Sequence, residues 1–178
     1  SADNSSEAFQ QVRAGAGAKY WIGEASLDHR MAFWYVFQVR TKIQGQIADG
    51  NLLPSEQLSL ASPFSIRGFD PNAVRADRGL TVTHELGLGT FSIGSWLRRR
   101  EYLRDQQAPF AFIDYGFGDS VNPLPGEEAL ALASTGLGWR MAINRSLFGE
   151  MTYGWQIHEE GFEDDLSGRL NARVSLRW

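Results

Sequence analysis

The segment WYVFQVRTKIQGQI, residues 34–47, alternates between two kinds of side chain along its length. One face is mainly apolar and consists of Tyr35, Phe37, Val39, Thr41, Ile43 and Ile47. The other face is polar and partly charged, and consists of Gln38, Arg40, Lys42, Gln44 and Gln46. A period of two over so many residues is the pattern of a β-strand. The segment therefore predicts a long strand with one apolar and one polar face.

The same alternation recurs along the rest of the chain. It is clear in residues 11–22 and 169–178, and weaker in residues 80–90, 109–118, 129–143 and 147–157. Strands of soluble sandwiches average about five or six residues, whereas a strand tilted across a bilayer needs about nine to eleven. Most of the seven predicted strands are of the longer kind. Length therefore favours an all-β, antiparallel transmembrane β-barrel, although the alternation alone also fits a soluble β-barrel or sandwich.

The predicted connections differ in length between the two ends of the strands. If Trp178 marks the periplasmic end, the outer connections are residues 49–79, 117–128 and 158–167. The inner connections are then residues 23–31, 91–108 and 144–145. Outer-membrane barrels have longer loops outside and short turns inside, which most of these connections follow. The exception, residues 91–108, predicts an extended hairpin end or a short amphipathic helix.

The last residue, Trp178, follows a series of alternating apolar positions. A terminal aromatic residue of this kind is typical of bacterial outer-membrane barrels, where the ring lies in the interfacial aromatic girdle. We interpret Trp178 as a terminal assembly signal, which makes the barrel-assembly machinery and outer-membrane lipid expected partners.

The composition argues against several other classes of protein. Without cysteine the chain has no disulfide, thiol nucleophile or thiolate metal site. A net charge of -4, with no basic cluster between aromatic residues, argues against nucleic acid. His84 and Glu85 lack the second histidine of a metalloprotease motif, and the acidic residues 159–165 match no calcium loop. We therefore predict no enzymatic activity, no cofactor and no metal site.

Residues 63–70, PFSIRGFD, lie in a stretch of about thirty residues with neither helix nor strand periodicity. Compact domains seldom contain so long a structureless connection unless it has a function. The arginine of this segment suits a buried carboxylate, and the glycine after it allows the backbone to approach a wall closely.

The strand at residues 109–118 offers such a carboxylate. Asp114 shares a face with Phe110, Phe112 and Gly116. The opposite face is apolar and consists of Ala111, Ile113, Tyr115 and Phe117. Because a carboxylate in contact with hydrocarbon is very costly, Asp114 is expected to face the interior of a barrel and to need a cation.

Several short motifs follow one another in a fixed order. They are Gln44-Gly45-Gln46, PSEQLSL at residues 54–60, SIRGFD at 65–70, DRG at 77–79, HEL at 84–86, FIDYG at 112–116 and STGLGWR at 134–140. This series resembles the carboxyl-terminal part of two-partner secretion transporters, the hemolysin-activator family of the outer membrane protein 85 superfamily. The resemblance covers almost the whole chain, and the combination of SIRGFD with FIDYG is specific.

The resemblance implies a fold and a domain organisation. The family has a sixteen-stranded barrel preceded by periplasmic POTRA domains. Residues 1–178 would be the C-terminal portion of the barrel, about seven to eight strands without the POTRA domains, with residues 49–79 folded into the lumen. The lumen-loop motif would be Ser65, Ile66, Arg67, Gly68, Phe69 and Asp70. Its partner on the wall would be Phe112, Asp114 and Gly116, with Arg67 paired to Asp114.

The resemblance also implies a function. The protein would export a partner exoprotein, unfolded and without ATP, across the outer membrane of a Gram-negative bacterium. Strand parity supplies a cationic luminal face suited to hydrated polypeptide or anions: Arg13, Lys19, Arg40, Lys42, Arg140, Arg169, Arg173 and Arg177. Two alternatives remain open, a barrel-assembly or insertion factor of the same superfamily and a soluble β-barrel binding module.

Overall fold

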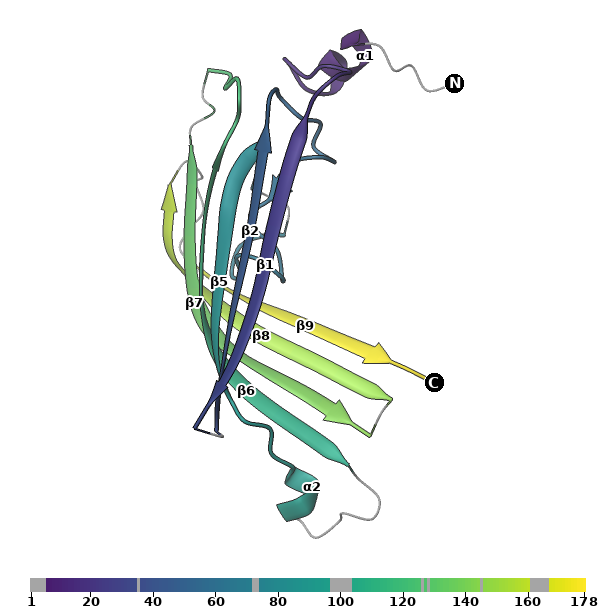
Figure 1. Ribbon diagram of the computed structural model, residues 1–178, viewed down its shortest axis with the longest axis vertical. Helices are drawn as coiled ribbons and strands as arrows, with labels where there is room; N and C mark the ends of the chain where they lie inside the picture. Colours follow the sequence, from purple (N-terminus) through teal and green to yellow (C-terminus); the bar gives the residue numbers. More distant parts are fainter. Residues whose placement is uncertain are drawn as a thin grey trace.

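Seven strands form one antiparallel sheet in the order β1-β2-β5-β6-β7-β8-β9. The computed structural model describes residues 6–34, 36–71, 74–96, 104–125, 127, 129–144, 146–160 and 167–178. The strands are β1 (Ile22–Phe33), β2 (Phe37–Ala48), β5 (Arg78–Leu88), β6 (Asp105–Asp119), β7 (Leu130–Ile143), β8 (Leu147–Glu160) and β9 (Gly168–Leu176). The predicted all-β, antiparallel fold is confirmed. The sheet is curved, as part of a barrel wall would be, and β1 and β9 form its edges (Figure 1).

The remaining described elements are short. Helix α1 (Ser6–Val12) precedes the sheet, and helix α2 (Ile93–Trp96) lies between β5 and β6. Strands β3 (Leu58–Ser59) and β4 (Arg75–Ala76) pair with each other between β2 and β5. Neither described helix has the length and apolar character needed to cross a membrane.

The first strand differs from the sequence prediction. Residues 11–22 were expected to form a strand, but α1 occupies Ser6–Val12 and the chain then turns at Gly15, with φ 77°. The small residues of AGAGA, 14–18, mimic a period of two yet offer little surface to pack in a sheet. The true strand, β1, fills the predicted connection 23–31 and pairs along its whole length with β2.

The two ends of the sheet carry different connections. At one end the connections are short, between β1 and β2 and between β7 and β8, and Trp34 and Asn144, just after β1 and β7, have φ 51° and 55°. Helix α2 lies at the same end, within the predicted connection 91–108, and residues 97–103 are outside the described part (Figure 1). The longer connections at the other end are residues 49–77 and 120–129. The predicted connection 158–167 lies mostly outside the described residues, and β8 extends into it as far as Glu160.

The faces of the strands follow the predicted alternation. On β6, Phe110, Phe112 and Asp114 are buried, whereas Ile113 is 52% exposed. On β2, Gln46 is buried and Ile47 is exposed; Tyr35 lies outside the described residues. Large apolar side chains are exposed on the outward face across the sheet: Leu27, Leu86, Ile113, Leu137, Met151 and Leu170.

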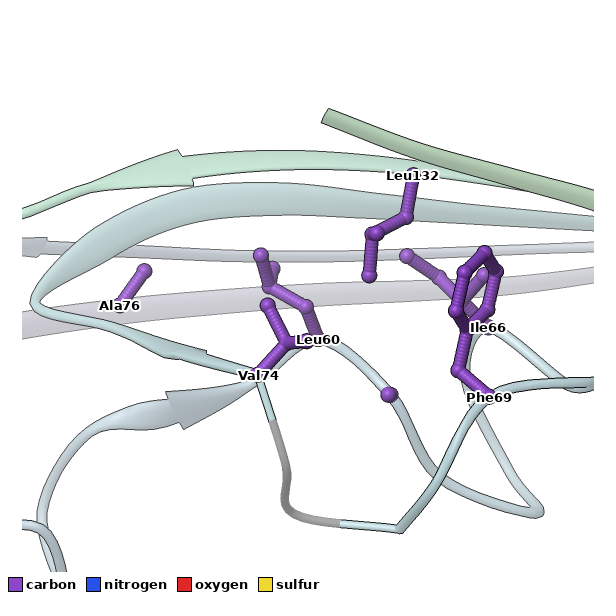
Figure 2. Close-up of a cluster of buried hydrophobic side chains, with 7 residues drawn as sticks. Leu60, Ile66, Phe69, Val74, Ala76 and Leu132 are labelled. Carbon is purple, nitrogen blue, oxygen red and sulfur yellow. The ribbon is translucent and has the colours of Figure 1, made fainter. Parts of the chain in front are cut away.

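The core lies between the sheet and residues 49–77, which we call the long loop. The cluster of buried apolar side chains consists of Leu60, Ala61, Ile66, Phe69, Val74, Ala76 and Leu132 (Figure 2). All of them except Leu132 of β7 belong to the long loop. The loop is therefore a packed element on the face of the sheet that we call inward, which is the concave side in Figure 1.

Candidate functional site

A buried ion pair joins the long loop to the middle of β6. Arg67 Nε donates to Asp114 Oδ2 at 2.8 Å, and Nη2 donates to Oδ1 at 2.7 Å. The backbone N–H of Arg67 also donates to Oδ2, at 3.1 Å. Arg67 is 4% exposed and Asp114 is fully buried. The planar guanidinium matches the two carboxylate oxygens, a geometry that a lysine ammonium cannot reproduce.

The ion pair continues into a network on three neighbouring strands. Arg67 Nη1 donates to Oε1 of Glu85 on β5 at 2.7 Å. Arg140 of β7 donates from Nη2 to both oxygens of Glu85, at 3.0 and 2.9 Å. Arg140 Nε also donates to Glu150 of β8 at 2.7 Å. We call these four residues and Asp114 the charge network.

Two aromatic rings of β6 support the guanidinium groups. Arg67 lies over the Phe112 ring, 3.6 Å from its centroid, and Arg140 lies over Phe110 at 3.9 Å. The rings in turn lie against Gly136 and Gly138, where a Cβ atom would collide with them. These two glycines therefore make room for the two rings.

The loop backbone approaches the sheet at β8. Gly68 has φ 99°, and a Cβ there would lie 3.1 Å from the carbonyl oxygen of Gly154. A Cβ on Gly154 would lie 2.9 Å from the nitrogen of Gly68. Gln156 Nε2 donates to the Gly68 carbonyl at 2.9 Å. The pair of glycines thus permits a contact between two main chains that any side chain would obstruct.

The other residues of the SIRGFD motif also have definite contacts. Ser65 Oγ donates to the Leu60 carbonyl at 2.6 Å, and Ile66 and Phe69 belong to the core. Ile66 packs where Gly116 lacks a side chain, and Asp70 pairs with Arg169 of β9. The motif therefore fastens the loop to β6, β8 and β9.

The predicted cationic face is smaller and more balanced than expected. Arg140 belongs to the charge network, Arg40 pairs with Asp28 at 2.6 Å, and Lys42 and Arg173 line a cavity beside Arg67. Arg177, just beyond β9, lies 5.4 Å from the Phe148 ring centroid. Arg13 and Lys19 are not part of this face, because the strand predicted for them does not form.

Arg13 instead helps to build a second buried site around Asp77, the first residue of the DRG motif. Asp77 is fully buried between β4 and β5. Its carboxylate pairs with Arg13 and accepts hydrogen bonds from Gln57 Nε2 at 3.0 Å and from the N–H groups of Leu52 and Val121 at 3.1 Å. The site joins the segment after α1, the long loop and residues 120–129.

Burial raises the pKa of Asp77, but the hydrogen bonds from Arg13, Leu52, Gln57 and Val121 outweigh that effect and leave the pKa below its ordinary value. Sequence reasoning missed this site, although DRG was among the motifs that carried the resemblance. The pairing of Asp77 with Arg13 was missed because Arg13 was predicted to lie on a strand and to face the lumen.

The remaining predicted features have simpler positions. Trp178 follows the end of β9 and is exposed. Among the described residues, no group of three histidine or acidic side chains is placed to hold a metal ion.

An open, curved antiparallel sheet with an apolar outward face, a charged inward face and a loop packed on that inward face has the features of a partial β-barrel wall. The family model described as haemolysin secretion/activation protein ShlB/FhaC/HecB matches residues 1–141, and the chain belongs to this family of two-partner secretion transporters. Comparisons with curated proteins and with solved structures give no match.

Proposed function

We propose that the protein exports a partner exoprotein across the bacterial outer membrane, in an unfolded state and without ATP. Residues 1–178 are the C-terminal portion of the transporting barrel in this proposal, and the inward face of the sheet borders the export path. The exposed apolar face, with Leu27, Ile113 and Met151, would contact outer-membrane lipid. Family membership supports the export role.

The observation that carries the proposal is the attachment of the long loop by Arg67. The loop packs on part of the inward face and would block polypeptide there, and the contacts of Arg67 with Asp114 and Glu85 fasten its middle to the wall. Gly68 with Gln156 and Asp70 with Arg169 add contacts beside them, so the polar attachment of the loop to the wall is concentrated in residues 67–70. We infer that the Arg67 contacts act as a latch during export.

Secretion of the partner tests the latch directly. In the full-length transporter, Arg67→Ala should reduce release of the exoprotein into the medium and increase cleavage of the loop by added protease. Arg78→Ala is the matched control, because Arg78 forms an exposed ion pair with Asp119 beside the same loop. Equal secretion by the two variants would contradict the proposal.

Substitutions on β2 test the membrane placement. Val39→Arg on the outward face should cost about 2–4 kcal/mol near the bilayer midplane, whereas Gln38→Arg should cost far less. Equal effects in a folding titration in lipid would contradict the assignment of faces. A soluble binding module would tolerate both substitutions.

The same strains distinguish export from barrel assembly. A barrel-assembly or insertion factor would, on loss of Arg67, lower the amount of several other outer-membrane barrels. The exporter proposed here should affect only the release of its own partner.

A further inference from the structure

The wall that holds Arg67 is built like a binding site whose present occupant is a side chain of the loop. Asp114 and Glu85 are almost fully buried and share contacts with Arg67. If Arg67 leaves, Arg140 remains as the guanidinium supplied by the sheet, and it is also bonded to Glu150. Asp114, whose hydrogen bonds in the described part of the chain all come from Arg67, is then left without a cation, although Arg40, Lys42 and Arg173 line the adjoining cavity. Because an unpaired buried carboxylate is costly, the vacated wall attracts another cation.

The geometry of the wall favours arginine over lysine. Asp114 accepts two parallel hydrogen bonds from the guanidinium, and Glu85 accepts a third from the remaining nitrogen. The Cζ atom of the group lies over the Phe112 ring, 3.6 Å from the ring centroid. A lysine ammonium has the charge, but it has neither the fork nor the flat face that these contacts use.

The wall also binds the main chain around the arginine. The N–H of Arg67 donates to Asp114, and the next carbonyl, that of Gly68, accepts a hydrogen bond from Gln156. The positive φ of Gly68 and its contact with Gly154 leave no room for a side chain after the arginine. The site therefore fits an arginine followed by glycine.

Two further observations show that the wall could make contacts with a ligand that the loop does not make. Ser134 of β7 is fully buried, and it is paired with Asp114 on β6 and with Gln156 on β8. Within the described part of the chain its hydroxyl has no hydrogen-bond partner. A cavity of about 320 Å³ opens beside Arg67. It is also lined by Lys42, Phe64, Thr83, Glu150 and Arg173.

We propose that this wall is a docking site for arginine side chains of the exported polypeptide, with arginine-glycine as the preferred sequence. The polypeptide occupies the site when the long loop withdraws. When the loop is in place, Arg67 fills the position that an arginine of the polypeptide would take. This inference rests on the proposed export function. It adds that the channel wall recognises its substrate by an arginine side chain followed by glycine.

Peptide binding to the full-length transporter in detergent tests the site. The Arg67→Ala variant is titrated by calorimetry with acetyl-Arg-Gly-amide, acetyl-Lys-Gly-amide and acetyl-Arg-Ala-amide. We expect the first peptide to bind at least about tenfold more tightly than either of the others. The lysine peptide lacks the fork that Asp114 and Glu85 accept, and the Cβ of the alanine peptide would meet the Gly154 carbonyl. Wild type, with the site occupied, should bind all three weakly. The Arg67→Gln variant provides the same comparison if Arg67→Ala fails to fold.

A second substitution and an export assay complete the test. Adding Asp114→Asn to Arg67→Ala should abolish the preference for arginine; a preference that survives, or equal affinity for the arginine and lysine peptides, would overturn the proposal. In vesicles containing the wild-type transporter, acetyl-Arg-Gly-amide should slow export of the partner more than acetyl-Lys-Gly-amide, and equal slowing would overturn the docking of polypeptide. If Arg67→Ala binds the peptide but exports normally, the latch function fails while the site stands.

Discussion

Two fully buried carboxylates hold the same loop, and they are held in different ways. Asp114, in the middle of β6, accepts three hydrogen bonds, all of them from Arg67. Asp77, at the base of the loop, accepts hydrogen bonds from four residues in three segments of the chain: Arg13, Leu52, Gln57 and Val121.

The difference separates a contact that can be released from one that is fixed. If residue 67 moves away from the wall, Asp114 loses all three of these hydrogen bonds at once, two from the guanidinium and one from the backbone N–H, so the contact is made or lost as a whole. Removal of Arg13 still leaves Asp77 with its backbone donors, Leu52 and Val121. We therefore expect the middle of the loop to detach while its base stays attached.

The largest effect is expected from a double-mutant cycle at the latch. Arg67→Ala and Asp114→Ala should each cost about 3–5 kcal/mol of folding stability in lipid, because each leaves a buried charge without its partner. The double variant should lose much less than the sum of the two. Additive losses would show that the pair does not interact, and the comparison with Asp77 would fail.

A smaller effect is expected at the base. Arg13→Ala should cost about 1.5–3 kcal/mol, the range for hydrogen bonds to charged groups, because the backbone donors continue to satisfy Asp77. Protease sites in residues 49–57 should remain protected, in contrast to those of the Arg67→Ala variant. A loss as large as that of Arg67→Ala would mean that both anchors respond in the same way.

Gly154→Ala sharpens the comparison without changing a charge. The added methyl group would lie 2.9 Å from the Gly68 nitrogen and should displace the loop from β8, at a cost of about 1–3 kcal/mol. Protection should fall near Gly68 and persist near Leu52. Hydrogen exchange of the two amides measures this difference, and Gly50→Ala is the control, since a Cβ there meets nothing within 4 Å.

The smallest expected effect is the change with pH in the folding stability that Asp77 contributes, which should be absent near neutral pH. Because its folded pKa is lowered, its stabilisation is complete above the ordinary aspartate pKa of about 3.9 and is lost as pH falls through the folded value. The stability difference between wild type and Asp77→Asn should therefore be constant from pH 7 to about 5 and shrink in stronger acid. Urea titrations at several pH values measure it; a difference that persists at pH 2 would contradict the assignment.

Local patterns predict some parts of this molecule better than others. The strand from Phe37 to Ala48 and the inward position of Asp114 follow from a period of two and the cost of burying charge. The same reasoning predicted a strand wrongly around residues 14–18, because alternating alanine and glycine has the period of a strand but lacks side chains that pack in a sheet.

The contacts across the sheet were harder to infer. The charge network needs the register that sets Glu85, on β5, opposite Phe112 and Arg140 opposite Glu150. No single segment encodes that register. The Asp77 site is harder still, since Arg13 lies 64 positions away in the sequence.

The composition of the core has a consequence for how the loop moves. Six of its seven residues come from the long loop, and Leu132 alone belongs to the sheet. A loop that leaves the sheet would therefore keep the contacts among its own six apolar side chains, but it would lose those with the sheet, where Ile66 packs at Gly116 and Ala76 at Gly118. Opening therefore costs buried apolar surface as well as the polar contacts at the wall, and a loop that moved as one unit would avoid only the conformational entropy change of unfolding a segment.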